Sequence, residues 1–247
     1  MRPSVHLILG ATGAVGGALA RLLHGRGDHV VLFGRSAAAL GELAGELAGA
    51  TAVEGDATRS ADVDRAVAAA IDAHGRLDGA VNCVGSVLLK PAHLTRDDEL
   101  LATLATNLHS SFWLVRAAAK AMQPHGGAIV LVSTAAARIG LANHEAIAAA
   151  KAGVEGLARA AAATYAARDV RINVVAPGLV RSKLTARITD SEAALKASLA
   201  MHPLGRIGEP DDVARAIAFL LAPDNRWITG QVLGVDGGLA DLKTRAG

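Results

Sequence analysis

The residues whose spacing first suggests chemistry are the glycines near the start of the chain. The segment Leu7–Gly17 is an apolar run followed by a G-x-x-G-x-x-G turn. Glycines let a backbone turn tightly and approach a pyrophosphate, whose charge is met by the N-terminus of the following helix. The pattern predicts dinucleotide binding; the alternative is a glycine-rich turn that packs a helix closely onto a sheet. The expected contacts are Gly10, Thr12, Gly13, Ala14, Val15 and Gly16.

A second signal follows the next apolar run, in Phe33-Gly34-Arg35-Ser36. Gly34 stands where an acidic residue would bind a ribose 2′-hydroxyl, and an arginine at this point can accommodate a 2′-phosphate instead. Arg35 and Ser36 therefore favour NADP (NADPH) over NAD. The alternative is that Arg35 is a solvated residue at the start of a helix.

These loops must be held by a framework, and the alternation of apolar runs with longer Ala-rich segments predicts one. The expected strands are Val5–Leu9, His29–Phe33, Thr51–Glu54, Gly79–Val81, Ala128–Val132, Arg171–Val175 and Val232–Val235. The expected helices include Ser36–Leu47, Asp62–Ala73, Asp97–Met122, His144–Arg168 and Asp211–Leu221.

This alternation predicts an α/β fold, with βαβ units and a mostly parallel seven-stranded sheet covered by helices on both faces. Right-handed crossovers make a doubly wound, Rossmann-type sheet the leading topology. We expect a single domain over residues 1–247. The segment at about 178–206 interrupts the alternation after a strand, and we expect it to be a substrate lid.

Composition narrows the classes of protein and partner. The chain has 247 residues, 51% hydrophobic and 19% charged, with a net charge of +2, which excludes a disordered or collagen-like chain. That charge gives no reason to expect nucleic-acid or membrane partners. One cysteine, Cys83, excludes a disulfide framework and a multi-cysteine zinc site, and we expect no metal. The start of the chain has no signal-peptide pattern, so we expect a cytoplasmic protein with a small-molecule substrate.

Several later motifs resemble those of the classical short-chain dehydrogenase/reductase family. They are Gly55-Asp56-Ala57, Asn82-Cys83-Val84-Gly85, Thr106-Asn107-Leu108, Pro177-Gly178, Pro203–Pro210 and Thr229–Gly238. The resemblance covers almost the whole chain in the family's order. It implies further nucleotide contacts at Asp56, Ala57, Asn82, Val84, Gly85, Lys151, Pro177 and Gly178. It also implies a homotetramer or homodimer that pairs the helices predicted at 97–122 and 144–168.

The chain departs from this family in its chemistry. The family's reaction moves a hydride between a nicotinamide and a carbonyl carbon. A tyrosine four residues before a lysine gives the oxygen its proton, a serine polarises the oxygen, and an asparagine completes the tetrad. Here the lysine is Lys151 and the asparagine is Asn107, but Ile147 stands in the tyrosine position. The serine position falls on Thr134, with Ser133 beside it, and either hydroxyl can hydrogen-bond an oxygen. Ala14 is a smaller departure, since the family has glycine there.

His144 is the best titratable candidate to replace the missing acid. His144, Ile147 and Lys151 are three and four residues apart, so they form one stripe on a helix. An imidazole with an ordinary pKa of about 6.5 suits proton transfer near neutrality. The layout is similar to enoyl-thioester reductases of the same superfamily, which carry a tyrosine seven residues before the lysine. The alternative is a residue at the start of the helix, near an Asn143 N-cap. The only tyrosine, Tyr165, is about 21 Å from Lys151 along the helix.

Three functions follow from this pattern. The first is an NADP-dependent reductase with an atypical site, acting on a small apolar carbonyl, enoyl or imine compound. Its proton would come from His144 or from water held on Lys151. The second is a non-redox dehydratase, isomerase or cyclase on the same fold, and the third is a silent nucleotide-binding protein. The glycine loop, Asp56, Asn107 and Lys151 favour a working cofactor site.

Overall fold

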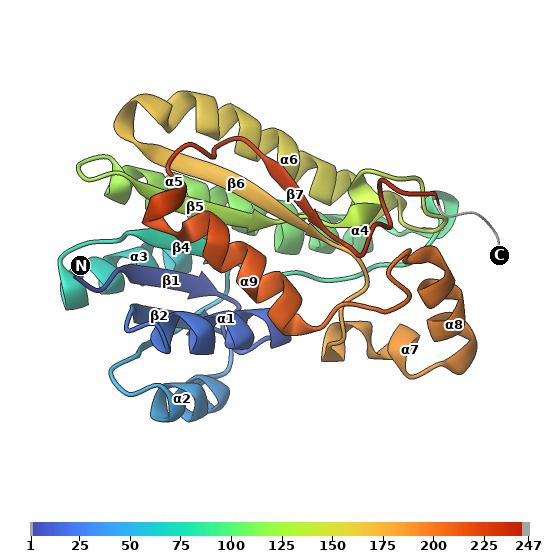
Figure 1. Cartoon of the computed structure of the whole chain (residues 1–247), viewed down its shortest axis with the longest axis horizontal. Coiled ribbons are helices and arrows are strands. Elements are labelled where there is room, and N and C mark those ends of the chain that lie inside the picture. The colour runs from blue at the N-terminus through green and yellow to red at the C-terminus, as the bar shows by residue number, and fades with distance from the viewer. Residues whose placement is uncertain (1, 244–247) are drawn as a thin grey trace.

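The computed structural model describes residues 2–243, and within them seven parallel strands form one sheet (Figure 1). The strand order is β3-β2-β1-β4-β5-β6-β7, so the winding direction reverses between β1 and β4. The strands are β1 (Val5–Leu9), β2 (His29–Gly34), β3 (Thr51–Glu54), β4 (Gly79–Asn82), β5 (Gly127–Val132), β6 (Val170–Pro177) and β7 (Val232–Val235). The predicted doubly wound α/β fold is confirmed, and the strand positions differ from prediction only at their ends.

Helices cover both faces of the sheet, as the continuous apolar strands require. The main helices are α1 (Ala14–His24), α2 (Ala37–Glu46), α3 (Ser60–His74), α4 (Asp97–Leu104), α5 (Ser110–Met122), α6 (Glu145–Tyr165), α7 (Ala186–Thr189), α8 (Glu192–Met201) and α9 (Pro210–Leu221). Ile8 points to one face, where Leu19 of α1 and Ile217 of α9 bury their side chains with it. Leu7 points to the other face and shares a core with α3, α5 and α6, including Leu114.

The segment predicted as one helix over Asp97–Met122 contains a π-helical turn, Ala105–His109, between α4 and α5. Side chains occupy the backbone carbonyls around this turn. The Ser110 hydroxyl donates to the Thr106 carbonyl at 2.6 Å, and the Ser111 hydroxyl donates to the Asn107 carbonyl at 3.1 Å. Local hydroxyl-to-carbonyl bonds of this kind compete with the regular helical ladder. The turn places Asn107, which is fully buried, at the point where the helix widens.

The segment 178–206 holds α7, α8 and a short 3₁₀ turn, Lys183–Thr185, and the sequence pattern predicted none of these three elements. Figure 1 shows α7 and α8 beyond the carboxyl ends of the strands. The Ser191 hydroxyl caps α8 by accepting from the Ala194 N–H, and the segment itself is rich in alanine and leucine, which favour a helix. Within residues 2–243, the helices are all too short or too polar to cross a membrane.

Candidate functional site

The main cleft of the described chain lies at the carboxyl ends of the central strands and has a volume of about 1010 Å³. Four loops line it, each following a different strand. They are 11–17 after β1, 83–87 after β4, 132–134 at the end of β5, and 177–178 at the end of β6. Ligands of open α/β sheets bind where the strand order reverses, and this cleft spans that point.

The glycine-rich loop is shaped by close backbone contacts. Gly10 has a left-handed φ of +75°, and a Cβ on Gly16 would lie 2.2 Å from the Gly10 carbonyl oxygen. No larger residue fits at position 16 without moving the loop. Gly13 precedes α1 and supplies no side-chain cap, so the first N–H groups of α1 have no side-chain partner there. Ala14 begins α1 on the cleft wall. This cradle fits the pyrophosphate of a dinucleotide.

The residues predicted to contact the adenosine end lie outside the lining of the main cleft. Arg35 is exposed. The Ser36 hydroxyl caps α2 by accepting from the Ala39 N–H at 3.3 Å. The Asp56 carboxylate accepts from the Thr58 N–H at 2.9 Å and from the Thr58 hydroxyl at 2.8 Å, a local turn that leaves its second oxygen open. Buried Ala57 belongs to the core.

Asn82 shapes the loop after β4. Its Nδ2 donates to the hydroxyls of Ser110 and Ser111, both at 2.9 Å, and its Oδ1 accepts from the Val84 N–H at 3.0 Å. The side chain therefore ties the loop to α5. This contact places Val84 and Gly85 on the cleft wall.

The structure brings five of the six predicted catalytic positions together on the cleft wall: Asn107, Ser133, Thr134, Ile147 and Lys151. The Lys151 Nζ donates to the Val132 carbonyl at 2.7 Å. The Asn107 Nδ2 donates to the Ser86 hydroxyl and to the Thr103 carbonyl, both at 2.9 Å. Ile147 is 4% exposed and presents only hydrocarbon.

Burial shifts the pKa values of two groups at this wall, Lys151 and Cys83. Desolvation lowers the pKa of Lys151 from 10.5 to about 8, because the charged ammonium is taken out of water. The same cause raises the pKa of the Cys83 thiol to about 12, so Cys83 is a neutral thiol at pH 7. Lys151 is the group here that exchanges protons near neutral pH.

The two candidate hydroxyls differ in their contacts. Ser133, which is 3% exposed, donates to the Glu155 carboxylate at 2.8 Å. The Thr134 hydroxyl accepts from the Ala136 N–H at 3.3 Å and has only a long 3.5 Å contact to the Pro177 carbonyl. The Thr134 hydroxyl can therefore donate a hydrogen bond to a substrate oxygen.

His144 stands immediately before α6 and is absent from the lining of the cleft. Its Nδ1 lies 2.8 Å from the Ala142 carbonyl. Tyr165 ends α6, packed against the core far from Lys151. The structure thus brings Ile147 and Lys151 to the cleft but leaves the titratable side chains of His144 and Tyr165 outside it.

His202 is a positioning residue that sequence reasoning missed. It is 3% exposed, its Nε2 accepts from the Leu179 N–H at 3.2 Å, and its Nδ1 lies 2.7 Å from the Ser198 carbonyl. The ring therefore ties the end of α8 to the turn after β6. Gly178 allows this approach, because a Cβ there would lie 2.7 Å from Nε2. The only signal was the position of His202 directly before the motif Pro203–Pro210.

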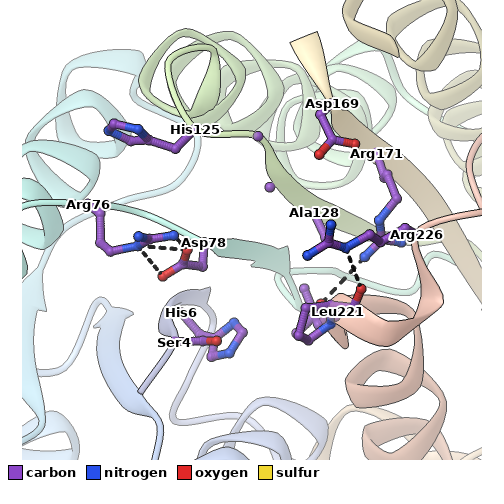
Figure 2. Close-up of a pocket in the computed structure, with 13 residues that line it drawn as sticks. Ser4, His6, Arg76, Asp78, His125, Ala128, Asp169, Arg171, Leu221 and Arg226 are labelled. Carbon is purple, nitrogen blue, oxygen red and sulfur yellow. Dashed lines mark hydrogen bonds and ion pairs between the residues drawn. The ribbon is translucent and has the colours of Figure 1, made fainter. Parts of the chain in front are cut away.

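A smaller cavity of about 140 Å³ lies at the opposite, amino end of the strands (Figure 2). Charged side chains that line it make hydrogen bonds and an ion pair within the fold. Arg171, 6% exposed, donates to the carbonyls of Leu220 at 2.9 Å and Ala222 at 3.2 Å, which end α9. Arg76 pairs with Asp78, whose other contact is the Val5 N–H at 2.9 Å. We assign this cavity a structural role.

Comparison with known proteins gives matches over nearly the whole chain. A family model described as enoyl-(acyl carrier protein) reductase matches residues 10–240. Carbonyl reductase family member 4 of Danio rerio is 36% identical over 239 residues, which cover 94% of this chain and 96% of that protein. A protein of Xanthobacter autotrophicus named inactive 2-(S)-hydroxypropyl-CoM dehydrogenase 2 is 36% identical over 230 residues, covering 91% of this chain and 100% of that one.

A solved structure of an actinorhodin polyketide ketoreductase variant with NADPH superimposes with a TM-score of 0.91. It is 27% identical and covers 97% of this chain and 98% of that one. The fold and the order of the elements are therefore shared over nearly the whole chain.

Proposed function

The chain belongs to the short-chain dehydrogenase/reductase family, and on that basis we propose that it is an NADPH-dependent oxidoreductase with an atypical active site. Its relatives are oxidoreductases, and the family binds nicotinamide cofactors. The proposed substrate is a small apolar compound with a carbonyl, enoyl or imine group. The observation that carries the proposal is the single cleft in which Asn107, Thr134 and Lys151 lie together with the glycine-rich loop. Ile147 makes the site atypical, because it is apolar where a proton donor is expected.

The proposed cofactor is NADPH, which supplies the hydride when bound. The backbone of Gly13, Ala14 and Val15 would hold the pyrophosphate, and Lys151 would hold the ribose next to the nicotinamide. Arg35 is exposed just after β2, next to Gly34, and this supports binding of a 2′-phosphate there. The similar ketoreductase structure with NADPH is in line with this choice.

The residues of the chain would polarise the substrate and supply its proton. Thr134 donates a hydrogen bond to the substrate oxygen or to the polarising group of a conjugated substrate. Lys151 holds a water molecule that delivers the proton, since its pKa near 8 allows proton exchange at neutral pH. His144 remains the second proposed source, and it would have to release the Ala142 carbonyl to reach the cleft.

Consumption of NADPH against a panel of matched substrates tests the proposal. The panel holds a ketone, an enoyl thioester and a cyclic imine of similar size. We expect turnover of the enoyl or imine compound to exceed that of the simple ketone, because carbon–carbon and iminium reduction need less protonation of an oxygen. Binding of NADPH without consumption of any panel member would refute the proposal.

A second function is a non-redox enzyme or a silent nucleotide-binding protein on this fold. The observation that favours it is the same Ile147, which removes the family's proton donor. One similar relative is itself named as inactive. Conversion of a panel compound without a change in NADPH would identify the non-redox enzyme.

We also propose a homotetramer or homodimer, a lid formed by about 178–206, and a cytoplasmic location. Large apolar side chains are exposed on α4, α5, α9 and the loop before β7: Leu101, Phe112, Phe219 and Trp227. Burial of these side chains against a second copy would stabilise an assembly. Light scattering at micromolar concentration is expected to give at least the dimer mass, and a monomer mass would contradict the assembly.

A further inference from the structure

One lysine on the wall of the cleft, Lys183, has no role in the proposed function. The lining of the cleft includes three apolar side chains, Val87, Ile147 and Leu184, together with Lys183 of the 3₁₀ turn. Lys183 is exposed to the cleft and to solvent. The cleft therefore offers a ligand both hydrocarbon surface and the cation of Lys183.

The other cations of the cleft and its rim are already occupied. Arg21 forms a two-point ion pair with Glu46, at 2.6 and 2.7 Å. Lys151 donates to a backbone carbonyl, and Arg181, two residues before Lys183, pairs with Glu209 at 3.2 Å. Lys183 makes no ion pair with a carboxylate anywhere in residues 2–243. It is the lining cation left open for a ligand.

The backbone that carries Lys183 is anchored on both sides. The Thr185 hydroxyl donates to the Val180 carbonyl at 2.6 Å, and the Ser182 hydroxyl accepts from the Thr185 N–H at 3.3 Å. The Arg181 N–H donates to the Gly208 carbonyl at 2.9 Å. A fixed turn places the base of the lysine at a constant position, so less of the backbone must be ordered on binding.

We propose that Lys183 binds an anionic group of the substrate, such as a carboxylate, while the apolar body of the substrate packs on Val87, Ile147 and Leu184. This inference rests on the proposed function in that it takes the region of Ile147 and Lys183 to be the substrate end of the cleft. The pyrophosphate of the nucleotide is a second anion that could reach the same cation, because Gly13 and Lys183 line one cleft. The experiment must separate the two sources.

The experiment measures binding of hexanoate and of hexanamide, its neutral analogue of equal length, by calorimetry on the full chain saturated with NADPH. The variant is Lys183→Ala. The control is Arg187→Ala, an exposed cation on α7 that does not line the cleft. We expect hexanoate to bind about fivefold more tightly than hexanamide, the strength of one partly exposed charge pair. The preference should persist in Arg187→Ala, disappear in Lys183→Ala, and weaken as salt is raised.

Three results would overturn the inference. One is equal affinity for the two probes, or no hexanoate binding, in the unchanged protein. Another is a hexanoate preference that survives Lys183→Ala. The third is weaker NADPH binding by Lys183→Ala with an unchanged probe preference, which assigns the cation to the nucleotide. None of these readouts requires hydride transfer, so failure of the proposed reaction is recognised separately.

Discussion

Replacing Ile147 with tyrosine tests whether a missing proton donor is what sets this site apart. Ile147 lies on the cleft wall one helical turn before Lys151, and Thr134 lies on the same wall. A phenol at position 147 would meet an ammonium whose charge favours phenolate formation, which tunes the acid toward neutral pH. General acid catalysis contributes about 10² to 10⁴ in rate. We therefore expect Ile147→Tyr to raise ketone reduction by at least about a hundredfold.

The structure also predicts a cost. Ile147 is 4% exposed, and a larger ring in a packed site destabilises a protein by about 1–3 kcal/mol. Ile147→Phe is the matched control, since it has the ring without the hydroxyl. The assay is NADPH consumption with one ketone, together with thermal unfolding and NADPH affinity for both variants. If Ile147→Tyr folds, binds NADPH and reduces the ketone no faster than Ile147→Phe, the missing acid is not the obstacle.

Four further predictions follow from single groups. His144→Ala should leave native turnover and NADPH affinity unchanged, because the ring lies outside the cleft lining; loss of turnover alone would make His144 the acid. Arg35→Ala should reduce the NADPH-over-NADH preference about tenfold in calorimetry, and an unchanged preference would remove Arg35 from the 2′-phosphate site. Arg171→Met should cost about 3 kcal/mol in denaturant unfolding, because buried carbonyls lose their donor, whereas exposed Arg226→Met should cost little. The difference in unfolding free energy between the unchanged protein and Lys151→Met should rise between pH 8 and pH 10.5. Burial favours the neutral Lys151 amine, so the cost of burying the ammonium is full below about pH 8 and is relieved as the pH rises toward 10.5. A difference in unfolding free energy that does not change with pH would refute this.

Much of the fold could be predicted because the sheet is buried on both faces. A strand such as β5 must then be continuously apolar, and that pattern is visible in the sequence. The π-helical turn at 105–109 was not predictable from periodicity. It depends on hydroxyl contacts of Ser110 and Ser111 that also serve ordinary helices. The helices α7 and α8 were missed because both are short and lie outside the alternation of strands and helices that builds the sheet.

The candidate site was predictable where spacing alone places a residue on a helix face, as for Ile147 and Lys151. Spacing failed for His144, since α6 begins one residue later and the ring points to a local carbonyl. The roles of Ser133 and Thr134 could not be separated in sequence, because the partner of Ser133 is Glu155, 22 residues away. His202 was invisible for the same reason, because its partners come together only when α8 packs against the end of β6.

Transfer of deuterium from the cofactor tests the central claim most directly. NADPH deuterated at the transferable position of the nicotinamide is incubated with the unchanged protein and each of the ketone, enoyl thioester and imine, and the products are analysed by mass spectrometry. The account predicts one deuterium on carbon in the product of at least one of these substrates. Products without deuterium, or no product from any of them while NADPH binds, would contradict it.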